Sequence, residues 1–292
     1  MEPDPTGKLH FSSIESQNKV VRVGPHAHKS FASRYALRCL WSEIITRELL
    51  VDLSISHIPV LRYSEESLTL VMPWIESEQQ LELPQDQLLK EVIHLSQVMW
   101  VNKEDPYSSY RLDHQSRIKP QKTFAKFVYS EVERHIQAHR SEFLVGLHTQ
   151  VLTLLAACPE VKSNFLCLLD VSPKNVFLEN GQLYHFDFEG TIVGPRDYFL
   201  CRTALNFVRD SNKSTDQAAR SAMKLIEQCE NDQLVRSSLA YSLTRMMLFN
   251  SIVNSKSFKP SLALQALCQG ADFHTVLSLV RELHQSGEIS EQ

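Results

Sequence analysis

The sequence predicts an α+β fold with two lobes, a small N-terminal lobe built on a sheet and a larger helical C-terminal lobe. Short runs of β-branched and apolar residues are concentrated in the first 75 positions, whereas most of the remainder repeats apolar residues every three or four positions. A chain of 292 residues is long enough for both lobes. We place the boundary near positions 75–84, which makes residues 1–78 the small lobe and residues 79–292 the large lobe.

The elements of the small lobe follow from local patterns. Residues 8–12 and 19–23 read as strands, and Gly24-Pro25 ends the second of them. Residues 35–51 carry an apolar stripe at helical spacing. Two further strands are predicted over residues 58–63 and 67–75.

The large lobe is predicted to be mainly helical. Residues 87–100 and 123–157 have helical periodicity, and helices return from residue 198. The second stretch is expected to form two helices, or one helix interrupted by a bend near Gly146. Between them, residues 175–178 and 183–186 form two short strands joined by an Asn-Gly turn, which favours a hairpin.

Composition excludes several classes of function. The formal net charge is −4 with no block of basic residues, so we expect no nucleic-acid partner. No apolar run reaches the roughly 18 residues that cross a bilayer, and the first residues lack the features of a signal peptide. The 6 cysteines show no metal-ligand spacing. We therefore expect a cytoplasmic protein without a membrane partner, and its oligomeric state stays open.

One segment carries the residues that phosphoryl transfer from ATP requires. Asp170 and Asn175 lie five positions apart on a loop, and the hairpin that follows delivers Asp187. Because the two strands run back on each other, Asn175 and Asp187 end near one another and can share a cation. Such chemistry needs a carboxylate that orients the attacking hydroxyl and oxygen ligands that hold Mg²⁺ against the phosphates.

This segment resembles the aminoglycoside phosphotransferase and choline-kinase-like family, small-molecule kinases that share the protein-kinase fold. Their catalytic loop reads H-G-D-x-x-x-x-N and their metal loop reads I-D-F/W-E or similar. The resemblance implies a bilobal protein-kinase-like fold, ATP and Mg²⁺ as cofactors, and transfer of the γ-phosphoryl group to a hydroxyl of a small molecule. It assigns Asp170 as the catalytic residue, and Asn175 and Asp187 as the metal ligands. Asp197 would brace the catalytic loop.

The resemblance extends upstream to residue 19. It assigns Arg22, on the strand before Gly24, to the nucleotide phosphates, and the segment around Met72 to adenine. Glu48 lies near the centre of the apolar stripe of the predicted helix, whereas Glu43 falls outside it, and a buried acid needs a partner. We therefore expect Glu48 to pair with Arg22. The alternative is that Glu48 is an exposed residue of the helix surface.

Three departures from the family pattern leave the activity open. Arg22 stands in place of a lysine, Leu168 replaces the usual histidine, and no glycine-rich phosphate loop is found, so we expect a shortened small lobe. Glu189 is left open as a further metal ligand, and Lys174 as a contact of the γ-phosphate. The alternative function is a pseudokinase or nucleotide-binding module with little transfer activity.

Overall fold

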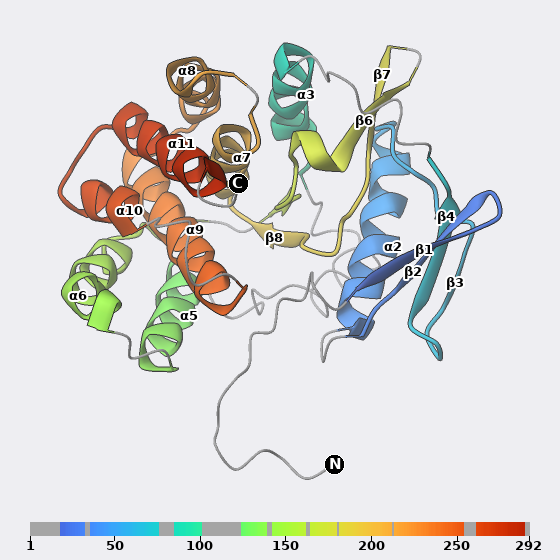
Figure 1. The fold of residues 1–292 in the computed structure, drawn as a ribbon, viewed down its shortest axis with the longest axis horizontal. Coiled ribbons are helices and arrows are strands. Elements are labelled where there is room, and N and C mark those ends of the chain that lie inside the picture. The colour runs from blue at the N-terminus through green and yellow to red at the C-terminus, as the bar shows by residue number, and fades with distance from the viewer. Residues whose placement is uncertain are drawn as a thin grey trace, which may run out of the picture.

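The structure, a computed structural model, describes residues 18–32, 36–75, 85–100, 124–138, 142–161, 164–179, 181–211, 213–253 and 261–289. The small lobe is a four-stranded antiparallel sheet in the order β1-β2-β4-β3, with helix α2 packed against it (Figure 1). Its elements are β1 (Lys19–Val23), β2 (His26–Ser30), α2 (Ala36–Asp52), β3 (Arg62–Ser64) and β4 (Thr69–Pro73). The strand predicted over residues 8–12 and the predicted boundary at residue 78 lie outside the described residues.

Strand β2 is the element that the sequence patterns failed to predict. Gly24 has a φ of 61°, a left-handed conformation that glycine adopts at little cost, and it turns the chain from β1 back into β2. Along β2 burial alternates, so that Ala27 and Lys29 point inward. The strand was missed because its sequence, His-Ala-His-Lys-Ser, has few of the residues that favour strands.

The buried face of α2 differs from the predicted stripe. Leu37 and Val51, which helped to define that stripe, are 48% and 63% exposed. Leu40 of the predicted stripe is buried, and Cys39 and Leu50 are buried beside it, on a face that also includes Glu43. Because the buried face contains the charged residue Glu43, apolar spacing alone does not indicate its direction.

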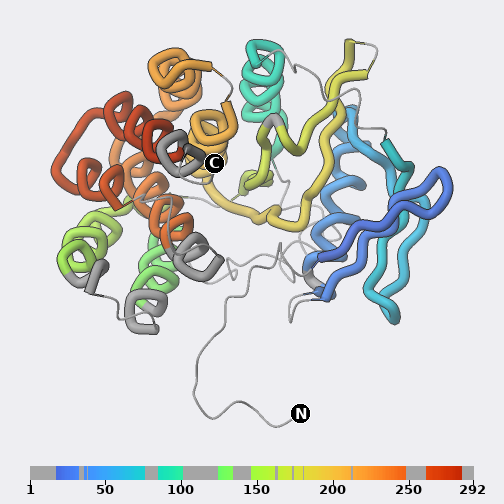
Figure 2. Tube along the Cα trace, in the orientation of Figure 1, coloured from blue at the N-terminus to red at the C-terminus, as the bar shows by residue number. Residues whose placement is uncertain are grey.

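The large lobe is predominantly helical in its described part and carries two small pairs of strands near the small lobe (Figure 2). Strand β5 pairs with β8, and β6 pairs with β7 in the expected hairpin. The elements are α3 (Gln85–Val98), α5 (Phe124–Ala138), α6 (Glu142–Ala156), β5 (Phe165–Cys167), the 3₁₀ turn η2 (Pro173–Asn175), β6 (Val176–Glu179), β7 (Gln182–His185), β8 (Ile192–Gly194), α7 (Arg196–Arg209), α8 (Thr215–Ile226), α9 (Asp232–Val253), α10 (Ser261–Cys268) and α11 (Phe273–Ile289).

Helix α7 is the central helix of this lobe. Tyr198, Phe199 and Leu200 are fully buried, and the helix contacts α3, α8, α9 and α11 as well as β5. The long helical stretch predicted before it forms two helices, α5 ending at Ala138 and α6 beginning at Glu142, and Gly146 lies within α6. No helix in the described ranges is both long and apolar enough to cross a membrane.

Candidate active site

The loop after β5 positions Asp170 and Asn175. The Ser172 hydroxyl accepts a hydrogen bond from the Lys174 backbone at 3.3 Å, which starts the 3₁₀ turn that ends at Asn175. The Asn175 amide then donates to the Asp170 carbonyl at 2.8 Å. Leu168 is 2% exposed and packs in the core of the large lobe, so this apolar residue supports the loop by burial.

The loop after β7 brings Asp187 to the same place. The Phe186 backbone donates to the Asn175 carbonyl at 3.1 Å, which ties the two loops together. Asp187 has a φ of 65°, a left-handed conformation uncommon for a residue with a side chain. A cleft lined by Asp170, Asn175 and Asp187 lies between the loops. The structure therefore brings the three predicted residues of the large lobe together.

The two loops also touch at Gly190. A Cβ atom added to Gly190 would lie 2.5 Å from Oδ2 of Asp170, closer than real Cβ contacts. Glycine at this position lets the metal loop pass directly beside the Asp170 carboxylate.

Lys29 connects the small lobe to this cleft. Its Nζ lies 2.6 Å from Oε1 of Glu43, 2.6 Å from Oδ1 of Asp187 and 3.5 Å from Oε2 of Glu189. Burial acts to lower the pKa of Lys29, but the carboxylates of Glu43, Asp187 and Glu189 outweigh it and raise that pKa above its ordinary range. Lys29 is therefore a buried, fully charged cation at the junction of the lobes.

Glu43 is fully buried and pairs with two buried cations, Lys29 and Arg47. Burial acts to raise its pKa, but Lys29 and Arg47 outweigh it and lower the pKa to about 2. The pKa of Asp187 is instead raised above its ordinary value, because burial raises it more than Lys29 lowers it.

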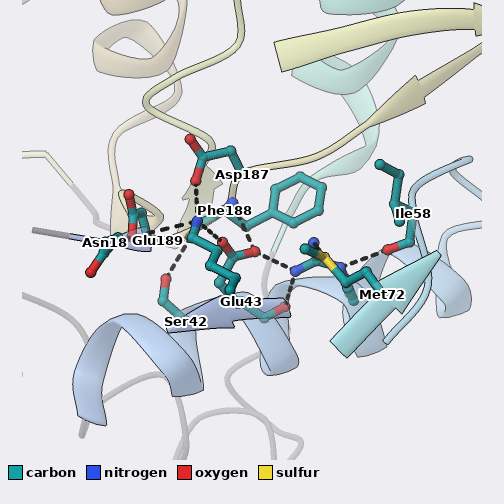
Figure 3. A network of polar contacts seen from close by, with 10 residues as sticks. Asn18, Ser42, Glu43, Ile58, Met72, Asp187, Phe188 and Glu189 are labelled. Carbon is teal, nitrogen blue, oxygen red and sulfur yellow. Dashed lines mark hydrogen bonds and ion pairs between the residues drawn. The ribbon is translucent and has the colours of Figure 1, made fainter. Parts of the chain in front are cut away.

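Helix α2 fastens the metal loop through the same residues. Oε2 of Glu43 accepts from the Phe188 backbone at 3.1 Å, and the Ser42 hydroxyl donates to the Phe188 carbonyl at 2.8 Å. Arg47 pairs with Glu43, donates to the Ile58 carbonyl at 2.7 Å, and stacks 4.7 Å from the Phe188 ring. Figure 3 shows this network joining α2 to the loop after β7. The left-handed Asp187 is thus held by contacts on its C-terminal side.

The assignment of Arg22 and Glu48 as the ion pair of the small lobe is wrong. Arg22 is exposed on β1, where its Nε donates to the Gly24 carbonyl at 3.1 Å, and Glu48 is exposed on α2. The buried pair consists of Lys29 and Glu43. Both errors have a physical cause: β2 was not predicted, and the direction of the α2 face was misjudged. The buried cation of this pair is a lysine, so the replacement of lysine by arginine expected from the sequence does not occur.

Met72 lies on β4 with its side chain turned toward the buried network. Its sulfur is 3.1 Å from an Nη of Arg47, and the residue is 8% exposed. Contact with adenine remains a prediction, and it would have to come from the backbone of this segment.

The residues left open by the sequence are also placed. Nζ of Lys174 pairs with Asp210 at 3.0 Å. Glu189 accepts from Asn18 and, with Glu43 and Asp187, offers carboxylate oxygens that all lie within 4.8 Å of one another. Lys29 already contacts all three of these carboxylates. Asn175 and Asp187 offer an amide oxygen and a carboxylate at the cleft, and oxygen donors of this kind fit Mg²⁺.

Helix α7 supplies a brace for the catalytic loop that the sequence did not reveal. The Asn206 amide donates to the carbonyls of Leu169 at 2.9 Å and Val171 at 3.3 Å. Arg202 donates from Nε to the Leu169 carbonyl at 3.3 Å. Asp197, expected in this role, instead accepts from the Glu230 backbone at 3.2 Å. The available signal was the spacing of Arg202 and Asn206, which lie four positions apart and so share one face of the helix.

Known proteins with similar sequences are not found: no family model matches the chain, and neither does any curated protein. Similar solved structures are found. Choline kinase LicA from Streptococcus pneumoniae has a TM-score of 0.53 at 14% identity, covering 97% of this chain and 92% of that one. The GDP and kanamycin complex of APH(2")-IIia has a TM-score of 0.56 at 12% identity, and the match covers 98% of this chain and 97% of that one. ADP-bound aminoglycoside phosphotransferase APH(2'')-Ib has a TM-score of 0.53 at 12% identity, and the match covers 91% of this chain and 94% of that one.

These similarities extend over nearly the whole chain and include both lobes. They confirm the predicted α+β architecture, a small sheet lobe beside a larger helical lobe. The protein therefore has the protein-kinase-like fold of the aminoglycoside phosphotransferase and choline-kinase-like family.

Proposed function

We propose that the protein is an ATP-dependent phosphotransferase that moves the γ-phosphoryl group to a hydroxyl of a small molecule. The observation that carries this proposal is the convergence of Asp170, Asn175 and Asp187 on one cleft, with Lys29 of the small lobe 2.6 Å from Asp187. Phosphoryl transfer depends mainly on positioning and charge stabilisation, and this arrangement supplies both.

Each residue has a role that its environment supports. Lys29 would bind the phosphates, and the fully buried Glu43 would keep its ammonium group in place. Asn175 and Asp187 would hold Mg²⁺, which, when bound, neutralises charge on the phosphates. Asp170 would orient the acceptor hydroxyl. As the hydroxyl oxygen bonds to the γ-phosphorus, the bond from that phosphorus to the β–γ bridging oxygen breaks, ADP leaves, and the hydroxyl proton passes to Asp170.

The described part of the small lobe also supports nucleotide binding. Lys29 pairs with Asp187 and Glu43 at once, so its charge is already oriented toward the cleft. The structural neighbours include ADP-bound and GDP-bound enzymes, which agrees with a nucleotide site between the lobes. Leu168 does not weaken the proposal, because Asn206 holds the backbone of the loop that the missing histidine would support.

A transfer assay tests the proposal against a module that only binds nucleotide. The purified chain is incubated with Mg²⁺ and ATP labelled at the γ-phosphate, together with a panel of hydroxylated small molecules. We expect label in an organic product, and we expect Asp170→Asn to lower its formation by about 100-fold or more without weakening nucleotide binding.

The control is Asp232→Asn, which removes an exposed carboxylate of α9 outside the cleft. It should leave transfer unchanged. Nucleotide binding without any transfer would favour the binding module, and transfer that survives Asp170→Asn would contradict the assigned role.

A further inference from the structure

The catalytic carboxylate lies next to a guanidinium group of the large lobe. Nη2 of Arg202, on α7, is 3.6 Å from Oδ1 of Asp170, and the Arg202 side chain is 14% exposed. Its Nε donates to the Leu169 carbonyl, so the group is held at the edge of the catalytic loop. At 3.6 Å the contact with Asp170 is an ion pair longer than a direct charge-assisted hydrogen bond. The Arg202 guanidinium is therefore held in place, and its N–H groups are not all used by Asp170.

A second guanidinium approaches from α9. Arg245 is partly exposed, lies 5.9 Å from the Tyr241 ring centroid, and interacts electrostatically with Asp170 and with the Tyr198 hydroxyl. Among the described residues, Arg202 therefore contacts Asp170 directly, and Arg245 adds a second positive charge that acts on the same carboxylate.

The positive charges of Arg202 and Arg245 are unfavourable for binding a cationic acceptor. Kanamycin, the ligand of one structural neighbour, is a polycation, and choline is a quaternary ammonium ion. A cationic group placed beside Arg202 and Arg245 would meet like charge, which is unfavourable. Guanidinium groups are instead suited to planar or tetrahedral oxyanions, because their N–H groups form a fixed fork.

Resting on the proposed phosphotransferase function, we propose that the acceptor carries an anionic group, a carboxylate or phosphate, beside the hydroxyl that is phosphorylated. Arg202 and Arg245 bind this group, and the hydroxyl then faces Asp170. The two guanidiniums also offset the repulsion between the anionic acceptor and the phosphates of ATP.

The test measures both binding and transfer with small acceptors that differ mainly in charge. The arms are choline and kanamycin (cationic), glycerol (neutral), glycerate (carboxylate) and glycerol phosphate (phosphate monoester). With Mg²⁺ and a non-hydrolysable ATP analogue present, we expect an anionic arm to raise the thermal midpoint. With ATP, we expect the same arm to be phosphorylated at least about tenfold more efficiently than the neutral or cationic arms.

Variants separate recognition of the anion from support of the loop. Arg202→Gln should lower kcat/KM for the anionic acceptor by about 10- to 100-fold, mainly through KM, while affinity for Mg²⁺–ATP stays unchanged. Arg202→Lys should restore part of the loss, because it restores the charge. Arg220→Gln, an exposed arginine of α8 paired with Asp216, is the matched control and should have no effect.

The inference is contradicted if a cationic acceptor is preferred, if no anionic arm raises the midpoint, or if Arg202→Gln affects all acceptors equally. Failure of Mg²⁺–ATP to bind, or insensitivity of transfer to Asp170→Asn, would instead contradict the proposed function. The two failures are therefore distinguishable.

Discussion

Lys29 is one of the residues that join the two lobes, and its role depends on its contacts with Glu43, Asp187 and Glu189. Its ammonium group lies within 2.6 Å of carboxylates from α2 and from the metal loop. Burial of such a cation is tolerated only because these carboxylates compensate it. Arg22, on β1, is exposed and makes a local contact with the Gly24 carbonyl.

The two cations can be distinguished by substitution. We expect Lys29→Met to lower kcat/KM for ATP by about 100-fold or more, because it removes the positive charge that faces the phosphates. Arg22→Met, the matched control, should change it by less than about twofold. Steady-state kinetics with varied ATP checks both values. A larger loss at Arg22 than at Lys29 would restore the assignment made from the sequence.

Glu43 makes the stability of the small lobe dependent on acid. Its pKa is about 2 in the folded protein against an ordinary value of 4.5, so the unfolded chain takes up a proton first as the pH falls. The stability that Glu43 contributes is complete above about pH 4.5 and is lost as the pH falls toward 2. Removing one partner of such a buried network costs about 3 kcal/mol or more.

We therefore expect Glu43→Gln to lower the free energy of unfolding by about 3 kcal/mol at pH 7. The difference in free energy of unfolding between the variant and the wild type should become smaller below pH 4.5. Urea unfolding from pH 7 to pH 3.5 measures the gap. A gap that is constant across this range would show that Glu43 is not held ionised by Lys29 and Arg47.

At the scale of elements, the hairpin and the helices were more predictable than the strand that completes the site. The β6–β7 hairpin has strong strand formers on both sides of its turn, so local chemistry specifies it. Strand β2 forms because its neighbours β1 and β4 pair with it on both sides, information that no short window contains. The site residues of the large lobe are close in sequence and could be predicted together. Lys29 and Glu43 come from β2 and from the misjudged face of α2, so they could not.

The close passage of the metal loop beside the catalytic loop gives a prediction for Gly190. A Cβ at this position would lie 2.5 Å from Oδ2 of Asp170 and would displace that carboxylate. We expect Gly190→Ala to lower kcat at least about tenfold, since small displacements of catalytic groups are costly.

Gly146→Ala is the matched control for this substitution. A Cβ at Gly146, within α6, would meet nothing within 4 Å. We expect the control to retain full activity and to gain up to about 1 kcal/mol of stability, because alanine favours the helix. Equal activity of Gly190→Ala and the wild type would mean that the two loops are not tightly packed in the active protein.

At the scale of the whole molecule, the periodicity of the sequence was enough to predict two lobes of different character. Apolar spacing specifies which segments are strands or helices, and burial of the resulting faces then assembles the lobes. It does not specify which polar groups are carried into the interface between them. The brace from α7, through Arg202 and Asn206, is such a case, because only the packed helix brings it to the catalytic loop.

If Asp187 is part of a site for Mg²⁺ and nucleotide between the lobes, these ligands should raise the midpoint of thermal unfolding. The midpoint is measured for the wild type, Asp187→Asn and the exposed control Asp86→Asn, each with ATP in the presence and absence of Mg²⁺. Ligand at about 100 times its dissociation constant should stabilise the wild type by about 2.7 kcal/mol, a shift of roughly 5 °C. We predict that this Mg²⁺-dependent shift is retained in Asp86→Asn and lost in Asp187→Asn. A wild type that shows no shift with Mg²⁺–ATP, or an Asp187→Asn variant that keeps it, would contradict the account.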